Sequence, residues 1–296
     1  MYDIFQKYHP LVNFSFFALV IGLSMVLHHP VAQLISCVCA ILYAVQTEGK
    51  KAVLFSLKFC LPVLLMTAFI NPAFNHAGVT ILTYLPTGNP LTLESILYGI
   101  SAGVMLVTVL VWFINFNRVI TSDKFIYLFG RIIPALSLVL SMTLRFIPKF
   151  QSQLACVTEA QRSIGRDVSE GSIWQRTKTA ITILSIMVTW ALENAIETAD
   201  SMKSRGYGLK GRTSFSIYHF EERDKLTLTW IGFCAVYLIS GCVASGFAFQ
   251  YFPLVRYAPL NPLTISFYLV YLALCLTPIV MNLIEEKKWK ALYSSM

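Results

Sequence analysis

The stretch from Ile96 to Phe116 reads ILYGISAGVMLVTVLVWFINF and contains no charged side chain. An α-helix needs about 20 consecutive apolar residues to cross a bilayer, so this stretch predicts a transmembrane helix. Gly99 and Gly103 form a G-x-x-x-G pattern inside it, which lets a neighbouring helix approach closely. A transmembrane β-barrel would show short alternating segments instead.

Similar apolar runs recur along the rest of the chain. Of its 296 residues, 56% are hydrophobic and 13% are charged, whereas soluble domains carry about 25% charged residues. The chain is therefore predicted to be an all-α, polytopic membrane protein. The other candidate spans are Leu11–Leu27, which we expect to be retained, Val31–Val45, Ala52–Ile70, Leu226–Tyr251 and Leu263–Ile284.

The distribution of Lys and Arg predicts the orientation. The turn His28–Pro30 and the loop Asn71–Glu94 contain neither residue, whereas 15 of the 23 Lys and Arg lie between Arg118 and Lys225. Cytoplasmic loops collect these cations, so both termini are predicted to be cytoplasmic. By the same rule, Phe125–Ile147 makes no net crossing and lies along the cytoplasmic face. The net charge of +8 follows from topology, and no nucleic-acid partner is expected.

The cationic region contains two long helical patterns. One runs from Pro134 to Ile164 and the other from Ser172 to Arg205, with a polar break between them. The apolar middle of the second helix, Ile181–Leu192, is too short to span a bilayer. We therefore expect two long helices on the cytoplasmic side. The predicted segments are 1–117 (N-terminal transmembrane helices), 118–225 (the cytoplasmic-side region with the two long helices) and 226–296 (C-terminal transmembrane helices).

Both helical patterns end in the same way. The first ends in Ala-Gln-Arg-Ser-Ile-Gly at 160–165, and the second in Ser-Met-Lys-Ser-Arg-Gly-Tyr-Gly at 201–208. A cation in the last turn suits the negative end of the helix dipole, and glycine suits the left-handed cap. Two basic C-caps would explain the pattern structurally. Their recurrence within one region favours a paired docking surface for a soluble partner, with Arg205 as its anchor.

Several chemistries have no counterpart in the sequence. It contains no G-x-x-x-x-G-K-[ST] phosphate loop, no H-E-x-x-H zinc motif and no G-x-S-x-G nucleophile elbow. The cysteines form no C-x-x-C. We therefore predict no catalytic residue, no metal site and no cofactor.

The second ending and the residues before it resemble a known family. The run Trp190–Ala195, followed by Ala199–Gly208, is similar to the signature of the transmembrane T component of energy-coupling factor (ECF) transporters. Glu159–Gly165 resembles the first coupling motif of that family. His9-Pro10 and the stretch from Thr121 through Phe146 also fit, so the resemblance extends over most of the chain.

The resemblance implies a non-catalytic subunit of a prokaryotic micronutrient importer in the plasma membrane. Its coupling helices would dock on two ATP-hydrolysing subunits and transmit their motion to a small membrane S component that binds a vitamin or transition metal. The implied docking residues are Ser204, Arg205 and Gly206 in the second motif, and Arg162, Ser163, Ile164 and Gly165 in the first.

One departure from the family pattern concerns the first motif. The usual arginine position holds Ile164, and the nearest cation is Arg162. Either Arg162 takes over, or this helix docks through packing.

Two other functions remain to be weighed. A stand-alone secondary transporter or channel would need polar groups at mid-membrane or inverted repeats. Lys58 is the intramembrane cation that could serve, although its long side chain can also snorkel to the interface. An intramembrane enzyme is disfavoured by the missing motifs.

Overall fold

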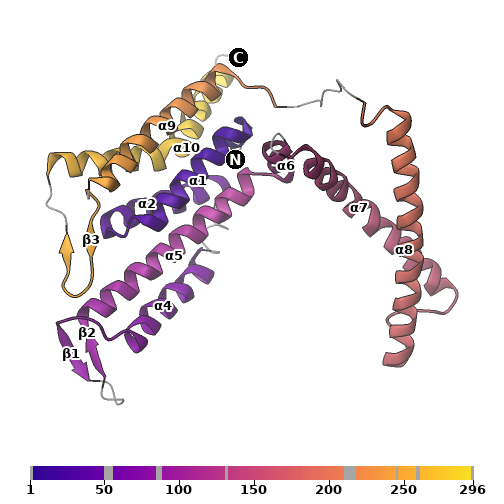
Figure 1. Cartoon of the computed structure of the whole chain (residues 1–296), viewed down its shortest axis with the longest axis horizontal. Helices are drawn as coiled ribbons and strands as arrows, with labels where there is room; N and C mark the ends of the chain where they lie inside the picture. Colours follow the sequence, from indigo (N-terminus) through magenta and orange to yellow (C-terminus); the bar gives the residue numbers. More distant parts are fainter. Residues whose placement is uncertain are drawn as a thin grey trace. The chain divides into compact units, whose positions relative to one another are not determined.

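The computed structural model describes residues 3–49, 56–84, 89–130, 133–209, 218–244, 246–257 and 261–294. The chain forms two compact units. Unit 1 comprises Met1–Phe125 and Tyr218–Met296, and unit 2 is the intervening stretch Ile126–Ile217. Figure 1 labels the helices and strands of both.

Unit 1 is a bundle whose long helices run side by side (Figure 1). Its N-terminal elements are η1 (Phe5–Lys7), α1 (Pro10–Val26), α2 (Pro30–Glu48), the π-helical turn η2 (Ser56–Cys60), α4 (Leu61–Phe74), β1 (Ile81–Tyr84), β2 (Pro90–Thr92) and α5 (Leu93–Val119). Its C-terminal elements are α9 (Glu222–Val243), β3 (Phe249–Gln250), β4 (Arg256–Tyr257) and α10 (Pro262–Ser294).

Most predicted spans correspond to these helices. Helices lie where the spans at α1, α2, α5 and α10 are predicted. Proline stands in the first turn of α1 and α2, where its missing N–H costs nothing. The span Leu226–Tyr251 was predicted too long, because α9 ends at Val243 and Phe249–Gln250 forms a strand. Residues 52–55 of the third span lie outside the described residues.

Five described helices are long and apolar enough to cross a membrane, judged by length and composition: α2, α5, α8, α9 and α10. The apolar helices α1 and α4 are shorter. The length expected of the apolar part of α8 was wrong, because α8 contains an 18-residue stretch that is apolar enough to cross a membrane. The all-α, polytopic membrane class is confirmed, with two small β-hairpins added to it.

The core of unit 1 combines apolar packing with satisfied polar groups. Trp112 of α5 is fully buried and donates its indole N–H to Ser36 Oγ at 2.9 Å. Ser36 is also 2.7 Å from Ser24 of α1, which lies 3.1 Å from the hydroxyl of Tyr271 in α10. Four helices are therefore joined through one buried polar cluster, which fixes their register more narrowly than apolar contact does.

Close packing of α4 on α5 explains the G-x-x-x-G pattern. A Cβ atom on Gly103 would lie 2.5 Å from Thr67 Oγ1, and one on Gly99 would lie 3.2 Å from the Cβ of Asn71. Both glycines therefore face α4, and the close approach expected from the sequence is confirmed.

Both β-hairpins lie at the end of unit 1 where α2 and α5 begin (Figure 1). Strand β1 pairs antiparallel with β2, and β3 with β4. The second hairpin is held by aromatic contacts, because Phe249 lies 5.2 Å from the His29 ring and Tyr251 lies 5.5 Å from Tyr98. This end carries the turn His28–Pro30 and the loop Asn71–Glu94, which lack Lys and Arg, together with Arg256 of β4.

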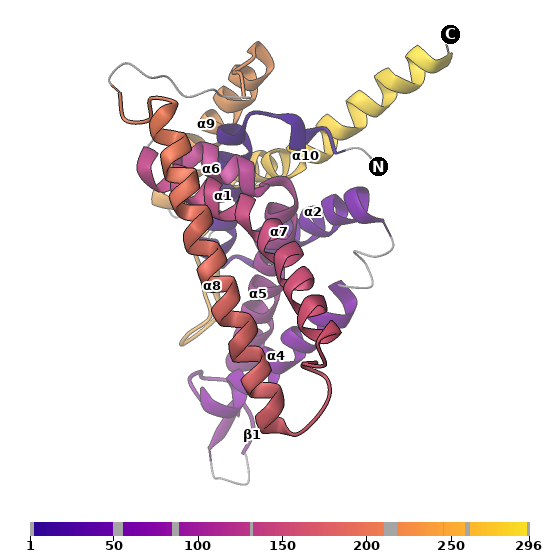
Figure 2. The same cartoon turned by 90° about the vertical axis from the view of Figure 1, so that its right-hand side faces the viewer.

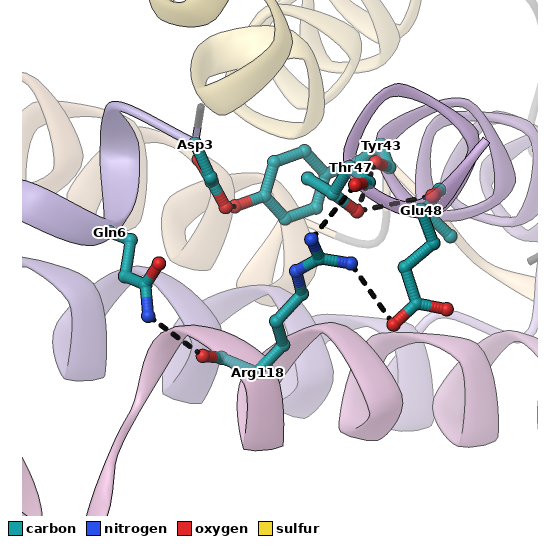
Figure 3. A network of polar contacts seen from close by, with 7 residues as sticks. Asp3, Gln6, Tyr43, Thr47, Glu48 and Arg118 are labelled. Carbon is teal, nitrogen blue, oxygen red and sulfur yellow. Dashed lines mark hydrogen bonds and ion pairs between the residues drawn. The ribbon is translucent and has the colours of Figure 1, made fainter. Parts of the chain in front are cut away.

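A polar network lies where α2 and α5 end (Figure 3). Arg118 of α5 donates to the carbonyl of Thr47 at 2.8 Å and pairs with Glu48 at 3.0 Å, so it caps the last turn of α2. Asp3 accepts a 2.7 Å hydrogen bond from the buried hydroxyl of Tyr43 and one from Asn282 of α10 at 3.0 Å. The N-terminal segment is thereby tied to α2 and α10.

The same N-terminal segment, residues 3–9, contacts both connections to unit 2. Lys124, before the boundary at Phe125, donates to the carbonyl of Gln6. After the return into unit 1, Asp224 accepts from the backbone N–H of His9 at 3.1 Å. Lys124 and Asp224 are 5% and 1% exposed, so both contacts are buried. Both connections therefore leave from the end of unit 1 that contains these charged residues.

Unit 2 is built on two long helices, α7 (Pro134–Ser163) and α8 (Ile173–Ser204), which Figure 2 shows side by side. Each end of these two helices lies within one residue of the end predicted from the sequence. α6 (Ser122–Gly130) precedes them and crosses the boundary between the units. Pro134 stands at the start of α7, as expected from its fixed φ.

Candidate docking tips of α7 and α8

The end of α7 is a Schellman motif. Ile164 is the C-cap residue, and Gly165 follows with φ of +76°. The N–H of Gly165 donates to the carbonyl of Arg162 at 3.0 Å, and the N–H of Arg166 donates to that of Gln161 at 3.0 Å. These two bonds satisfy carbonyls that the end of the helix leaves without a partner.

The end of α8 repeats this arrangement. Arg205 is the C-cap residue, and Gly206 has φ of +75°. The N–H of Gly206 donates to Lys203 at 3.0 Å, and the N–H of Tyr207 donates to Met202 at 3.0 Å. The prediction that both motifs are helix C-termini with glycine in the left-handed cap is confirmed.

The equivalence extends to side chains. Ser163 donates its hydroxyl hydrogen to the carbonyl of Ala160 at 2.8 Å, and Ser204 donates to that of Ser201 at 2.9 Å. Each serine is the last helical residue before its cap. The backbones of 160–166 and 201–207 therefore match position by position, so differences between the tips reside in their side chains.

This alignment assigns a counterpart to each cation. Arg205 corresponds to Ile164, and Lys203 corresponds to Arg162. The C-cap φ and ψ angles are similar, at −97° and 16° for Ile164 and −82° and 9° for Arg205. Ile164 is 62% exposed, and Arg205 is also exposed. The two tips thus present an apolar and a cationic side chain from the same cap position.

Arg162 takes part in the turn after α7. Its Nε lies 3.1 Å from a carboxylate oxygen of Asp167. Hydrogen bonds from Ser169, together with the Arg162 guanidinium, hold the pKa of Asp167 below its usual value. The carboxylate that faces Arg162 is therefore charged at neutral pH.

The contacts between α7 and α8 determine where the tips lie. Phe150 packs against Trp190 with 5.2 Å between ring centroids, and Lys149 donates to Asn194 at 2.6 Å. A small apolar core of Val157, Ile183 and Met187 lies nearby. Residues that come later in α7 therefore contact residues that come earlier in α8, so the helices run in opposite directions.

The two tips consequently lie beyond opposite ends of the contact region. Along α7, Ile164 lies 15 positions after Lys149. Along α8, which runs in the opposite direction, Arg205 lies 11 positions after Asn194. At 1.5 Å per residue, this corresponds to roughly 40 Å of helix between the tips. The structure brings the residues of each motif together and keeps the two motifs apart.

The loop joining the helices is internally braced. Gln175 accepts from the N–H of the N-cap residue Ser172 at 3.1 Å, and Arg176 donates to the carbonyl of Val168 at 2.7 Å. The sequence predicted that the second helical pattern begins at Ser172, but it did not predict the contact of Arg176 or the pairing of Arg162 with Asp167. The Asp-x-Ser turn at 167–169 was the available signal, because Asp side chains commonly bond the backbone two residues onward.

Comparison with known proteins identifies relatives. No family model matches the chain. The chain is 30% identical over 200 residues to the energy-coupling factor transporter transmembrane protein EcfT 1 of Listeria monocytogenes. This alignment covers 62% of the chain and 73% of the relative. EcfT of Bacillus selenitireducens is 38% identical over 94 residues, an alignment that covers 31% of this chain and 35% of that relative. EcfT of Staphylococcus aureus is 37% identical over 97 residues, an alignment that covers 32% of this chain and 36% of that relative. The last two alignments thus span about a third of those relatives.

Proposed function

The chain belongs to the family of energy-coupling factor transporter transmembrane proteins, and we propose that it is the coupling subunit of an importer of this class. It transmits the ATP-driven motion of two ATPase subunits to a small membrane S component that binds a vitamin or a transition metal. Its location is the plasma membrane of a prokaryote, and it catalyses no reaction itself.

The observation that carries this proposal is the pair of matched caps at Ile164 and Arg205. Two exposed tips with the same backbone, separated by about 40 Å of helix, suit a partner with two receiving sites. Arg205 is the anchor of the second tip, because a planar guanidinium makes several directed hydrogen bonds in a desolvated interface. Ser204 and Gly206 shape that tip. Arg162, Ser163, Ile164 and Gly165 form the first.

The proposed orientation places the ATPases in the cytoplasm. The end of unit 1 from which both connections to unit 2 leave carries Arg118 and Lys124, whereas the loop Asn71–Glu94 lies toward the end with the hairpins. Cations collect on the cytoplasmic side of membrane proteins. Unit 2 therefore connects to the cytoplasmic end of the bundle, and both termini are cytoplasmic.

The stand-alone transporter gains no support from the polar groups inside unit 1. Ser24, Ser36, Trp112 and Tyr271 bond one another and serve helix packing. The side chain of Lys58 is exposed in η2, where its long stem suits snorkelling.

An affinity purification of the tagged full chain from its host, in mild detergent, tests the proposal. We expect two P-loop ATPases and a small apolar membrane protein to be retained. Arg205→Glu places a carboxylate at the anchor, and losing an interface hot spot costs about 2 kcal/mol or more, which corresponds to at least a 30-fold weaker association.

The matched control is Lys287→Glu, which makes the same charge change on an exposed residue of α10 in unit 1. It should retain the ATPases as the wild type does. Recovery of a stable wild-type chain without ATPases would refute the proposed function, and equal retention by Arg205→Glu would refute the anchor.

A further inference from the structure

The two tips share their backbone but differ in the side chain at the cap position, which is Ile164 in α7 and Arg205 in α8. On the basis of the proposed function, we infer that the two ATPase receiving sites are chemically different. Ile164 enters an apolar site on one subunit, and Arg205 enters an acidic site on the other. Arg162 is not the replacement for the missing arginine and instead positions the turn after α7.

The geometry of the caps separates Arg162 from the docking position. Each helical residue advances the side-chain direction by about 100°, so residues two positions apart point to nearly opposite sides. Arg162 therefore points away from the direction taken by Ile164, as Lys203 points away from that of Arg205. For Arg162 to act as the anchor, the α7 tip would have to approach its partner with the opposite face.

Arg162 also has a contact of its own. Its Nε pairs with Asp167 at 3.1 Å, and Asp167 accepts a 2.9 Å hydrogen bond from the N–H of Ser169. Among the described residues, no ion pair to Arg205 exists. Arg162 is thus partly neutralised, while Arg205 is available for an acidic partner. Arg166, which is also exposed, follows the glycine of the first tip and corresponds to Tyr207.

Charge complementarity then distinguishes the two sites. An acidic site that suits Arg205 would be left with an unpaired carboxylate if Ile164 occupied it, and burying an unpaired charge is strongly unfavourable. An apolar site that suits Ile164 would desolvate Arg205 without compensation. Each tip therefore disfavours the site of the other, and the difference orients unit 2 on the ATPase pair in one of two possible ways.

Photo-crosslinking tests the two sites directly. A photoreactive amino acid is placed at position 166 or at the matched position 207 of the tagged full chain, which leaves Ile164 and Arg205 in place. Both positions are exposed, and the crosslinked peptides from membranes of the host organism are sequenced. We expect position 166 to react with a peptide rich in aliphatic or aromatic residues, and position 207 to react with a different peptide that contains Asp or Glu. Crosslinking of both positions to the same peptide sequence would overturn the inference.

Substitutions give an independent readout of ATPase retention. Ile164→Leu keeps an apolar side chain and should retain the ATPases to within 2-fold. Ile164→Arg should lower retention at least 10-fold, and Arg162→Ala should lower it no more than 3-fold. The inference would be overturned if Arg162→Ala lost as much ATPase retention as Ile164→Arg, or if Ile164→Arg retained more ATPase than the wild type. Either result would leave the proposed function standing. A wild type that retains no ATPase would instead refute the proposed function, and this inference with it.

Discussion

Units 1 and 2 differ in where their apolar residues lie. Unit 1 buries large side chains such as Phe16, Trp112 and Leu274 completely. In unit 2 the described core consists of Val157, Ile183 and Met187, while Ile181 and Leu184 of α8 are 61% and 63% exposed. The shape of unit 1 is therefore determined by its own packing. Unit 2 is held by caps and a short contact region, and it leaves apolar surface for lipid or for other subunits.

The largest expected effect comes from removing a buried aromatic residue of unit 1. Trp112→Ala would leave a cavity and the Ser36 hydroxyl without its indole donor, and such truncations cost about 3–5 kcal/mol. The matched change in unit 2 is Trp174→Ala, because Trp174 is 78% exposed and exposed substitutions alter stability by about 0.5 kcal/mol or less.

SDS-induced unfolding in mixed micelles measures both variants. Equal losses of stability for Trp112→Ala and Trp174→Ala would contradict the contrast between the buried apolar residues of unit 1 and the exposed ones of unit 2.

A smaller effect is expected from pH at the N-terminal segment. Burial lowers the pKa of Lys124 from 10.5 to about 8, and nearby Asp3 opposes the shift. Between these pH values the unfolded chain binds more protons than the folded chain, so stability rises as the pH increases from 8. The full pKa shift corresponds to at most about 3 kcal/mol of unfolding free energy. Residual hydration of the side chain reduces this contribution to about 1–2 kcal/mol.

The measurement is the unfolding free energy of the full chain at pH 7.5 and pH 9.5. Lys124→Met serves as the control, because it lacks the titrating group and should show a smaller rise. An identical pH dependence in both proteins would exclude Lys124 as its source.

The smallest expected effects come from the caps of unit 2. Alanine at a left-handed position costs about 1 kcal/mol, so Gly165→Ala and Gly206→Ala should both fray their helices. Gly206→Ala should cost more, because its Cβ would lie 2.9 Å from Leu209 Cδ1, whereas Gly165 has open space around it. Hydrogen exchange of the last turns of α7 and α8 measures the difference. Faster exchange in Gly165→Ala than in Gly206→Ala would contradict the steric argument.

Local signals made unit 2 the more predictable of the two. Pro134, Gly165, Ser172 and Gly206 mark the ends of α7 and α8, and each acts through its own backbone or near neighbours. The apolar runs of unit 1 likewise predicted most of its helices. At the candidate site, the same glycines predicted the caps. The motif comparison already placed Ile164 at the arginine position, and the structure adds the matching hydrogen bonds of the two caps.

The contacts that hold unit 1 together could not be predicted in this way. Asp3 bonds Tyr43 and Asn282, and Trp112 bonds Ser36. These partners are distant in sequence, so no local period or spacing encodes them. The end of α9 was missed for a related reason. The apolar residues after Val243 continue the pattern of a span, but Phe249 and Tyr251 contact the aromatic rings of His29 and Tyr98.

The contacts of residues 3–9 have a mechanical consequence. Unit 2 is joined to unit 1 through the chain on both sides, and these connections are fastened to the same short segment by Lys124 and Asp224. The ring of His9 also lies 4.9 Å from that of Phe220. A pull on either connection is therefore shared with the other, and both loads pass through Asp3 and Asn282 into α2 and α10.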